Sequence, residues 1–75
     1  MVAFNDLNIG DSAKIVGYQE HNEQVAKLQS LGLVPGTLLT LVRAAPLGDP
    51  IQVNVRGYSL AISKRTAEVL RLAAP

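Results

Sequence analysis

Hydrophobic and polar positions alternate with a period of two in three short segments, and each segment is predicted to be a β-strand with one buried face. The alternation is clearest over residues 51–56, where isoleucine and valine occupy the odd positions and polar residues the even ones. Residues 12–18 show the same period. Residues 58–62 show it too, which predicts that Tyr58 faces inward together with the other apolar side chains of that segment.

Two more strands are predicted from composition. Residues 37–45 are rich in leucine, threonine and valine, and because apolar residues occupy both faces we expect Leu39 and Leu41 to be the inward pair. A short last strand is predicted over residues 69–72, after a single helical turn at residues 64–68 that Ser63 can cap.

A longer helix is predicted between the first two strands. Asn22 is a residue type that caps helix N-termini, and Glu23 follows it where the helix dipole favours negative charge. Gly32 then suits the left-handed conformation that ends many helices, and a Pro-Gly turn follows at residues 35–36. Between the two ends, apolar residues recur three apart and form one buried stripe: Val25, Leu28 and Leu31.

These elements predict a mainly β fold and a single domain over residues 1–75. Five short strands with tight turns indicate a small barrel, with one α-helix inserted after the first strand and a short helical turn near the C-terminus. We expect the barrel to be closed, because open strand edges invite pairing with other chains.

Composition narrows the classes of function. Seven Lys and Arg against six Asp and Glu give a net charge of +1, too little for an overall attraction to nucleic acid. No apolar run approaches the roughly 20 residues that span a bilayer, and no leader is evident, so we expect a cytoplasmic protein without membrane insertion. The absence of cysteine excludes disulfides and thiolate chemistry.

One stretch offers ligands for a metal ion. His21 is the only histidine, and Glu20 and Glu23 flank it, so the three residues could form a weak site for Fe²⁺ or another divalent cation. The alternative is a solvated histidine beside the acidic residues that helix starts prefer. We favour this second interpretation and expect no tightly bound cofactor.

No pattern of residues predicts catalysis. The serines occur in predicted strands, helices and caps, and none lies in a Gly-x-Ser-x-Gly turn. The glycines form no phosphate-binding motif and serve as turn residues instead. We therefore predict no catalytic residues and a protein that is not an enzyme.

The loop at residues 46–50 is the strongest candidate for binding another protein. Prolines bound it at both ends, and Leu47 lies between them. A rigid loop that presents an apolar side chain loses little entropy on binding. The alternative is a hairpin tip with Leu47 folded back on the barrel.

Two segments resemble a known family. Residues 28–37, LQSLGLVPGT, resemble the helix-exit motif LxxLGLxPGT of ferrous iron transport protein A, and residues 43–51, RAAPLGDPI, resemble its RxAPLGDPI. The VRGY at residues 55–58 and the LNIGD at residues 7–11 are similar to its sequence in order and spacing.

The resemblance implies an SH3-like barrel with an inserted helix. It also implies a role as an accessory of bacterial ferrous iron uptake, on the cytoplasmic side of the inner membrane. The implied partner is the membrane transporter, ferrous iron transport protein B, through its cytoplasmic GTP-binding domain.

We therefore expect a non-catalytic protein that binds this transporter through one surface. The surface comprises Leu28, Pro46, Leu47, Gly48 and Asp49. The first alternative is direct binding of a divalent transition metal. The second is a barrel that binds nucleic acid, which the near-neutral charge disfavours.

Overall fold

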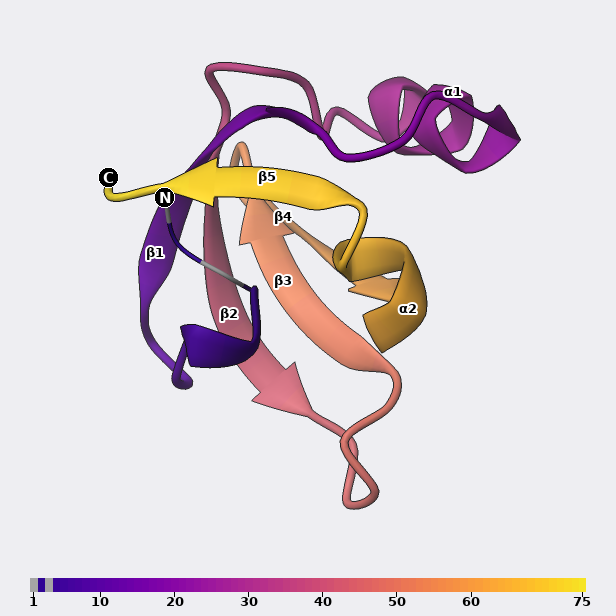
Figure 1. The fold of residues 1–75 in the computed structure, drawn as a ribbon. Helices are drawn as coiled ribbons and strands as arrows, with labels where there is room; N and C mark the ends of the chain where they lie inside the picture. Colours follow the sequence, from indigo (N-terminus) through magenta and orange to yellow (C-terminus); the bar gives the residue numbers. More distant parts are fainter. Residues whose placement is uncertain (1, 3) are drawn as a thin grey trace.

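The computed structural model describes residue 2 and residues 4–75, and it is built around one sheet of five strands (Figure 1). In chain order the elements are the 3-10 turn η1 (Phe4–Asp6), β1 (Ser12–Tyr18), α1 (Glu23–Ser30), β2 (Leu38–Ala44), β3 (Ile51–Val55), β4 (Tyr58–Ile62), α2 (Lys64–Ala67) and β5 (Leu70–Ala73). The predicted order of strands and helices is confirmed.

The strands are antiparallel and ordered β4-β3-β2-β1-β5. The sheet curls, so that β5 crosses in front of β2 and β3 in Figure 1. The end strands β4 and β5 do not pair with each other, and the expectation of a fully closed barrel is therefore wrong. The chain between them forms α2 instead, and Ala67 of α2 is completely buried.

The core consists of the inward side chains of all five strands together with Phe4 of η1, Ala67 of α2 and apolar side chains of the α1 segment. Leu39 is fully buried and Leu41 nearly so, as predicted for β2. The alternation of β3 is confirmed as well, since all of its odd positions are buried: Ile51, Val53 and Val55. Two leucines join them from the helical segment, namely Leu28 on α1 and Leu33 just after it.

The predicted ends of α1 are confirmed. The Asn22 side chain accepts hydrogen bonds from the backbone N–H groups of Gln24 and Val25, at 3.0 and 3.3 Å. Gly32 has a φ of +94°, the left-handed conformation that suits glycine after a helix. These signals fix the start and the end of α1 because each of them acts within its own turn of the helix.

The register places Tyr58 on the inward face of β4, opposite the buried Val55, as the pattern predicts, but its side chain is not part of the buried core. It is 43% exposed, and its hydroxyl donates to the backbone carbonyl of Leu31 at the end of α1. Tyr58 is the first residue after a two-residue hairpin, whose central residues Arg56 and Gly57 both have positive φ. Its ring therefore reaches the end of α1 instead of the core.

Among the described residues, neither helix combines the length and the apolar character that crossing a bilayer would require.

Candidate partner-binding site

The loop between β2 and β3 projects from the end of the sheet (Figure 1). Two backbone hydrogen bonds shape it: Gly48 N–H donates to the Ala45 carbonyl at 2.7 Å, and Ala45 N–H donates to the Pro50 carbonyl at 3.0 Å. The first bond closes a tight turn, and the second closes the base of the loop. The loop is therefore held by its own backbone as well as by its two prolines.

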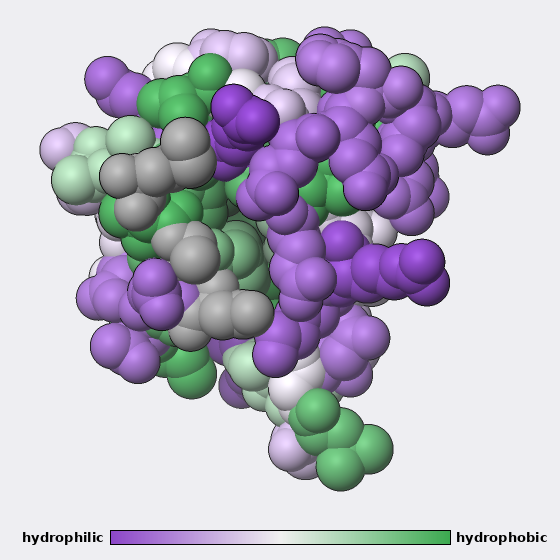
Figure 2. Space-filling view, in the orientation of Figure 1, coloured by the Kyte–Doolittle hydropathy of each residue, from purple (hydrophilic) through white to green (hydrophobic). Residues whose placement is uncertain are grey.

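Leu47 is at the tip of this loop and is 96% exposed. Figure 2 shows a strongly apolar group at the end of the projecting loop, standing clear of the rest of the visible surface. Of the two arrangements expected from sequence, the structure therefore has the exposed side chain and not the one folded back on the barrel. An apolar side chain held clear of the surface can only be buried by something outside the molecule.

Asp49 connects the loop to the rest of the domain. Its Oδ1 accepts a hydrogen bond of 2.8 Å from the backbone N–H of Lys64, the first residue of α2. This N–H is one of the helix-start donors that lack a partner within the helix. The sequence does not predict this contact, because the two residues are fifteen positions apart and no local pattern connects the loop with the start of α2.

Leu28, which was expected to belong to the same surface, lies in the core. It is 1% exposed and packs with the inward side chains of the strands. A partner cannot reach this side chain while the domain is folded, so Leu28 is not part of the site that we consider further. The remaining members of the site come from one loop: Pro46, Leu47, Gly48 and Asp49.

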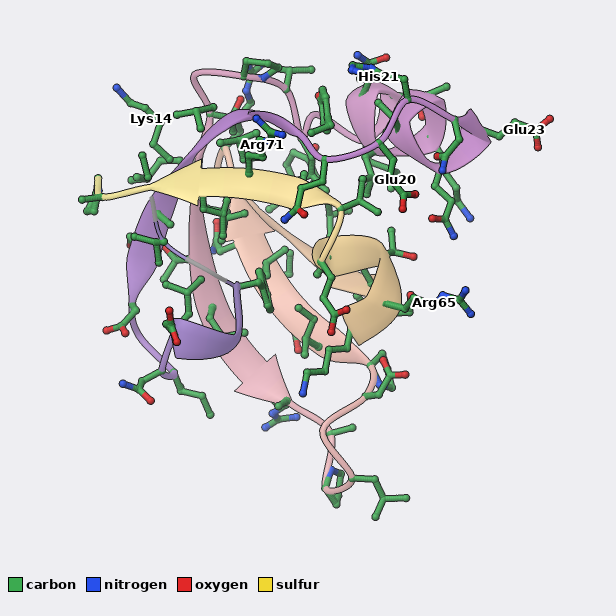
Figure 3. All side chains as sticks on the ribbon, viewed as in Figure 1. Lys14, Glu20, His21, Glu23, Arg65 and Arg71 are labelled. Carbon is green, nitrogen blue, oxygen red and sulfur yellow. The ribbon has the colours of Figure 1, made fainter. Side chains whose placement is uncertain are left out.

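The three candidate metal ligands lie close in sequence but point in different directions (Figure 3). His21 and Glu23 point away from each other, and Glu20 points toward α2. The Glu20 carboxylate accepts a hydrogen bond of 2.9 Å from the Asn22 side chain. Within residue 2 and residues 4–75 there is no group of three or more His, Cys, Asp or Glu that could hold a metal ion.

A groove of about 660 Å³ lies between the segment before α1 and α2. Its walls are mostly polar and include Gln19, Glu20, Arg65 and Glu68, with the buried side chains of Phe4 and Val69 among its lining residues. It contains no histidine, so it has neither the ligands of a typical transition-metal site nor the base of a Ser-His pair.

The family model described as "FeoA domain" matches residues 2–73. A curated Fe(2+) transport protein A/Fe(2+) transporter FeoB fusion protein from Porphyromonas gingivalis is 29% identical over 63 residues. These residues are 84% of this chain and 8% of the fusion protein, so the chain spans a small part of that relative's length.

Solved structures agree with the family match. The solution structure of the FeoA protein from Chlorobium tepidum is 34% identical, with a TM-score of 0.87 over 97% of this chain and 70% of that one. The zinc-complexed FeoA of Stenotrophomonas maltophilia, described as a prokaryotic SH3 domain protein, has a TM-score of 0.81 over 97% of this chain and 91% of that one. At 22% identity this second likeness shows the fold alone, which is SH3-like as expected.

Proposed function

Because the chain belongs to the FeoA domain family, which is associated with ferrous iron transport, we propose that it is a non-catalytic accessory protein of ferrous iron uptake that acts by contacting the membrane transporter FeoB. The observation that carries the proposal is the fusion of a related domain to FeoB in one polypeptide. Two domains joined in one chain meet at a high effective concentration, even where their contact is weak. Two domains on separate chains that work together need a surface through which they bind each other.

The loop at the end of β2 supplies such a surface. Leu47 is almost fully exposed, and the loop that carries it is closed by backbone hydrogen bonds and connected to α2 by Asp49. A preorganised apolar side chain can enter a pocket of the partner at little cost in conformational entropy. The partner in this proposal presents an apolar socket for one leucine on its cytoplasmic side, in or beside the GTP-binding domain.

This role needs no tightly bound metal in the accessory chain. The ferrous ion is the cargo of the transporter, and the accessory chain acts through protein contact. The proposed location is the cytoplasm, at the inner membrane, where the transporter holds the domain.

The proposal is tested by complementing a strain that lacks this gene and measuring ferrous iron uptake. Leu47→Asp should fail to restore uptake, because a charged side chain cannot enter an apolar socket. Ile9→Asp is the matched control, since Ile9 is also an exposed apolar residue (66%) but lies before β1 and outside the loop. Both variants should melt like the wild type, because loop side chains contribute little to the core. Full uptake with a normally folded Leu47→Asp chain would show that this surface is the wrong one.

A further inference from the structure

The charged residues are unevenly distributed between the sheet and the rest of the chain. The five strands contain three cations, Lys14, Arg43 and Arg71, and no carboxylate. The acidic residues all lie in turns, loops and helix ends: Asp6, Asp11, Glu20, Glu23, Asp49 and Glu68. Although the net charge of the whole chain is only +1, every charged side chain on the five strands is positive.

The register brings two of these cations to one part of the outer face. Lys14 pairs with Leu38 on β2 and with Ala73 on β5. Arg71 lies on β5 opposite Gly17, the residue after an irregularity in β1. Both cations are exposed, and Figure 3 shows them projecting from the same side of the β1–β5 pair, away from Arg65 on α2.

A third cation reaches the same region from the β3–β4 hairpin. Arg56 follows Val55, which pairs with Leu39, so it comes beside Leu38. Its backbone has a φ of +51°, and its Nη2 lies 3.5 Å from Oγ1 of the buried Thr37. The turn thus holds Arg56 in place at the edge of a shallow groove of about 480 Å³, which Leu38 also lines.

Two exposed aliphatic side chains lie among these cations. Leu38 and Val16 are each 47% exposed, and Leu38 stands directly across the β1–β2 ladder from Lys14. Side chains that face each other across an antiparallel ladder are about 5 Å apart, so Leu38 is in contact range of the Lys14 stem. The outer-face patch consists of Lys14, Val16, Leu38, Arg56 and Arg71.

We propose that the outer-face patch docks an acidic surface of the partner transporter that also carries apolar side chains, as a second contact in addition to Leu47. The inference rests on the proposed function, because it names the charge of the partner surface. Guanidinium and ammonium groups without acidic neighbours on their strands attract carboxylates, and the exposed leucine and valine add apolar area to the contact.

The spacing of the two contacts fits one interface. Leu38 begins β2, and the loop with Leu47 follows the end of the same strand, so the contacts are separated by somewhat more than the length of β2. Seven strand residues span roughly 20 Å. A standard interface covers about 800 Å² on each partner, which is wide enough to include both.

The test compares two double charge reversals for binding to the detergent-solubilised transporter of the same organism. Lys14→Glu/Arg71→Glu changes the patch, and Lys27→Glu/Arg65→Glu changes exposed cations on the two helices. Each reversal of a cation to glutamate lowers the net charge by two units, so each double variant goes from +1 to −3. The two variants are therefore matched in net charge. Circular dichroism melting confirms that each variant folds.

The patch variant should bind at least about tenfold more weakly, mainly through slower association, and the difference should shrink as salt is raised. The helix variant should lose less than about twofold. Arg56→Gln, which removes one charge, should weaken binding in the same direction by a smaller factor.

Equal losses in the two double variants, or none in the patch variant, would overturn the inference while leaving the proposed function standing. A wild-type chain that does not bind the transporter would overturn both.

Sedimentation with phosphatidylglycerol and phosphatidylcholine vesicles distinguishes a lipid partner from a protein partner. If the wild-type chain binds the anionic vesicles and the patch variant does not, while both bind the transporter equally well, the patch is a membrane contact. This result would contradict the proposal.

Discussion

The Oδ1 atom of Asp49 accepts a hydrogen bond from the backbone N–H of Lys64 at 2.8 Å, which connects the β2–β3 loop to the first turn of α2. The bond gives Asp49 a structural role within the domain, in addition to its place in the proposed partner surface. Its carboxylate is directed to the domain itself, and it positions the loop that carries Leu47. Both partners are exposed, so the bond adds only modestly to the stability of the fold.

Replacing Asp49 with alanine should therefore affect function more than folding. We expect Asp49→Ala to lower the free energy of unfolding by about 1 kcal/mol or less, the size of a helix-cap contact. Iron uptake should fall partially, because Leu47 is then less firmly held. Asp49→Asn keeps an acceptor oxygen and should restore most of the uptake. Equal impairment by the two substitutions would show that the charge of Asp49 matters and not the position of the loop.

Gly32 is a second position where a small change should have a large effect. A Cβ built on Gly32 would lie 2.6 Å from the Tyr58 hydroxyl oxygen, and the φ of +94° is itself unfavourable for any other residue. Gly32→Ala should cost roughly 1–2 kcal/mol for the backbone conformation alone, which lowers the Tm of a domain this small by about 4–8 °C per kcal/mol.

Thermal melts of Gly32→Ala with and without Tyr58→Phe separate the two causes. The phenylalanine removes the hydroxyl that meets the new Cβ, so part of the loss should be recovered relative to the Tyr58→Phe single variant. An identical loss in both backgrounds would assign the whole effect to the backbone.

Ferrous iron should bind the purified chain weakly or not at all. The chain has one histidine and no cysteine, and the three residues considered as ligands point in different directions. Anaerobic calorimetric titration with Fe²⁺ measures this, and His21→Ala should give the same trace as the wild type. A sub-micromolar site that His21→Ala abolishes would contradict the prediction and favour a direct metal-binding role.

Local sequence signals predicted the parts of the structure that depend on neighbouring residues. Asn22 and Gly32 mark the ends of α1 because a cap and a left-handed residue act within one turn. The alternation in β3 predicted its buried side chains because a strand between two others has one face toward the core and one toward solvent.

Relationships between distant residues could not be predicted in this way. Tyr58 continues the apolar alternation of β4, but the end of α1 lies beside the hairpin and offers the Leu31 carbonyl as a hydrogen-bond acceptor. The bond between Asp49 and Lys64 depends on how the β2–β3 loop meets α2. Leu28 was assigned both to a buried stripe and to a partner surface, and only the packed structure distinguishes them.

The most direct test of the central claim is calorimetric titration of the purified chain into the detergent-solubilised FeoB transporter of the same organism. Saturable binding is expected, and Leu47→Asp should weaken it fivefold or more, since a buried apolar anchor contributes more than about 1 kcal/mol. The matched variant Ile9→Asp should bind like the wild type. Absence of saturable binding by the wild-type chain would contradict the proposed role, and unchanged binding by Leu47→Asp would contradict the assignment of the loop as its contact surface.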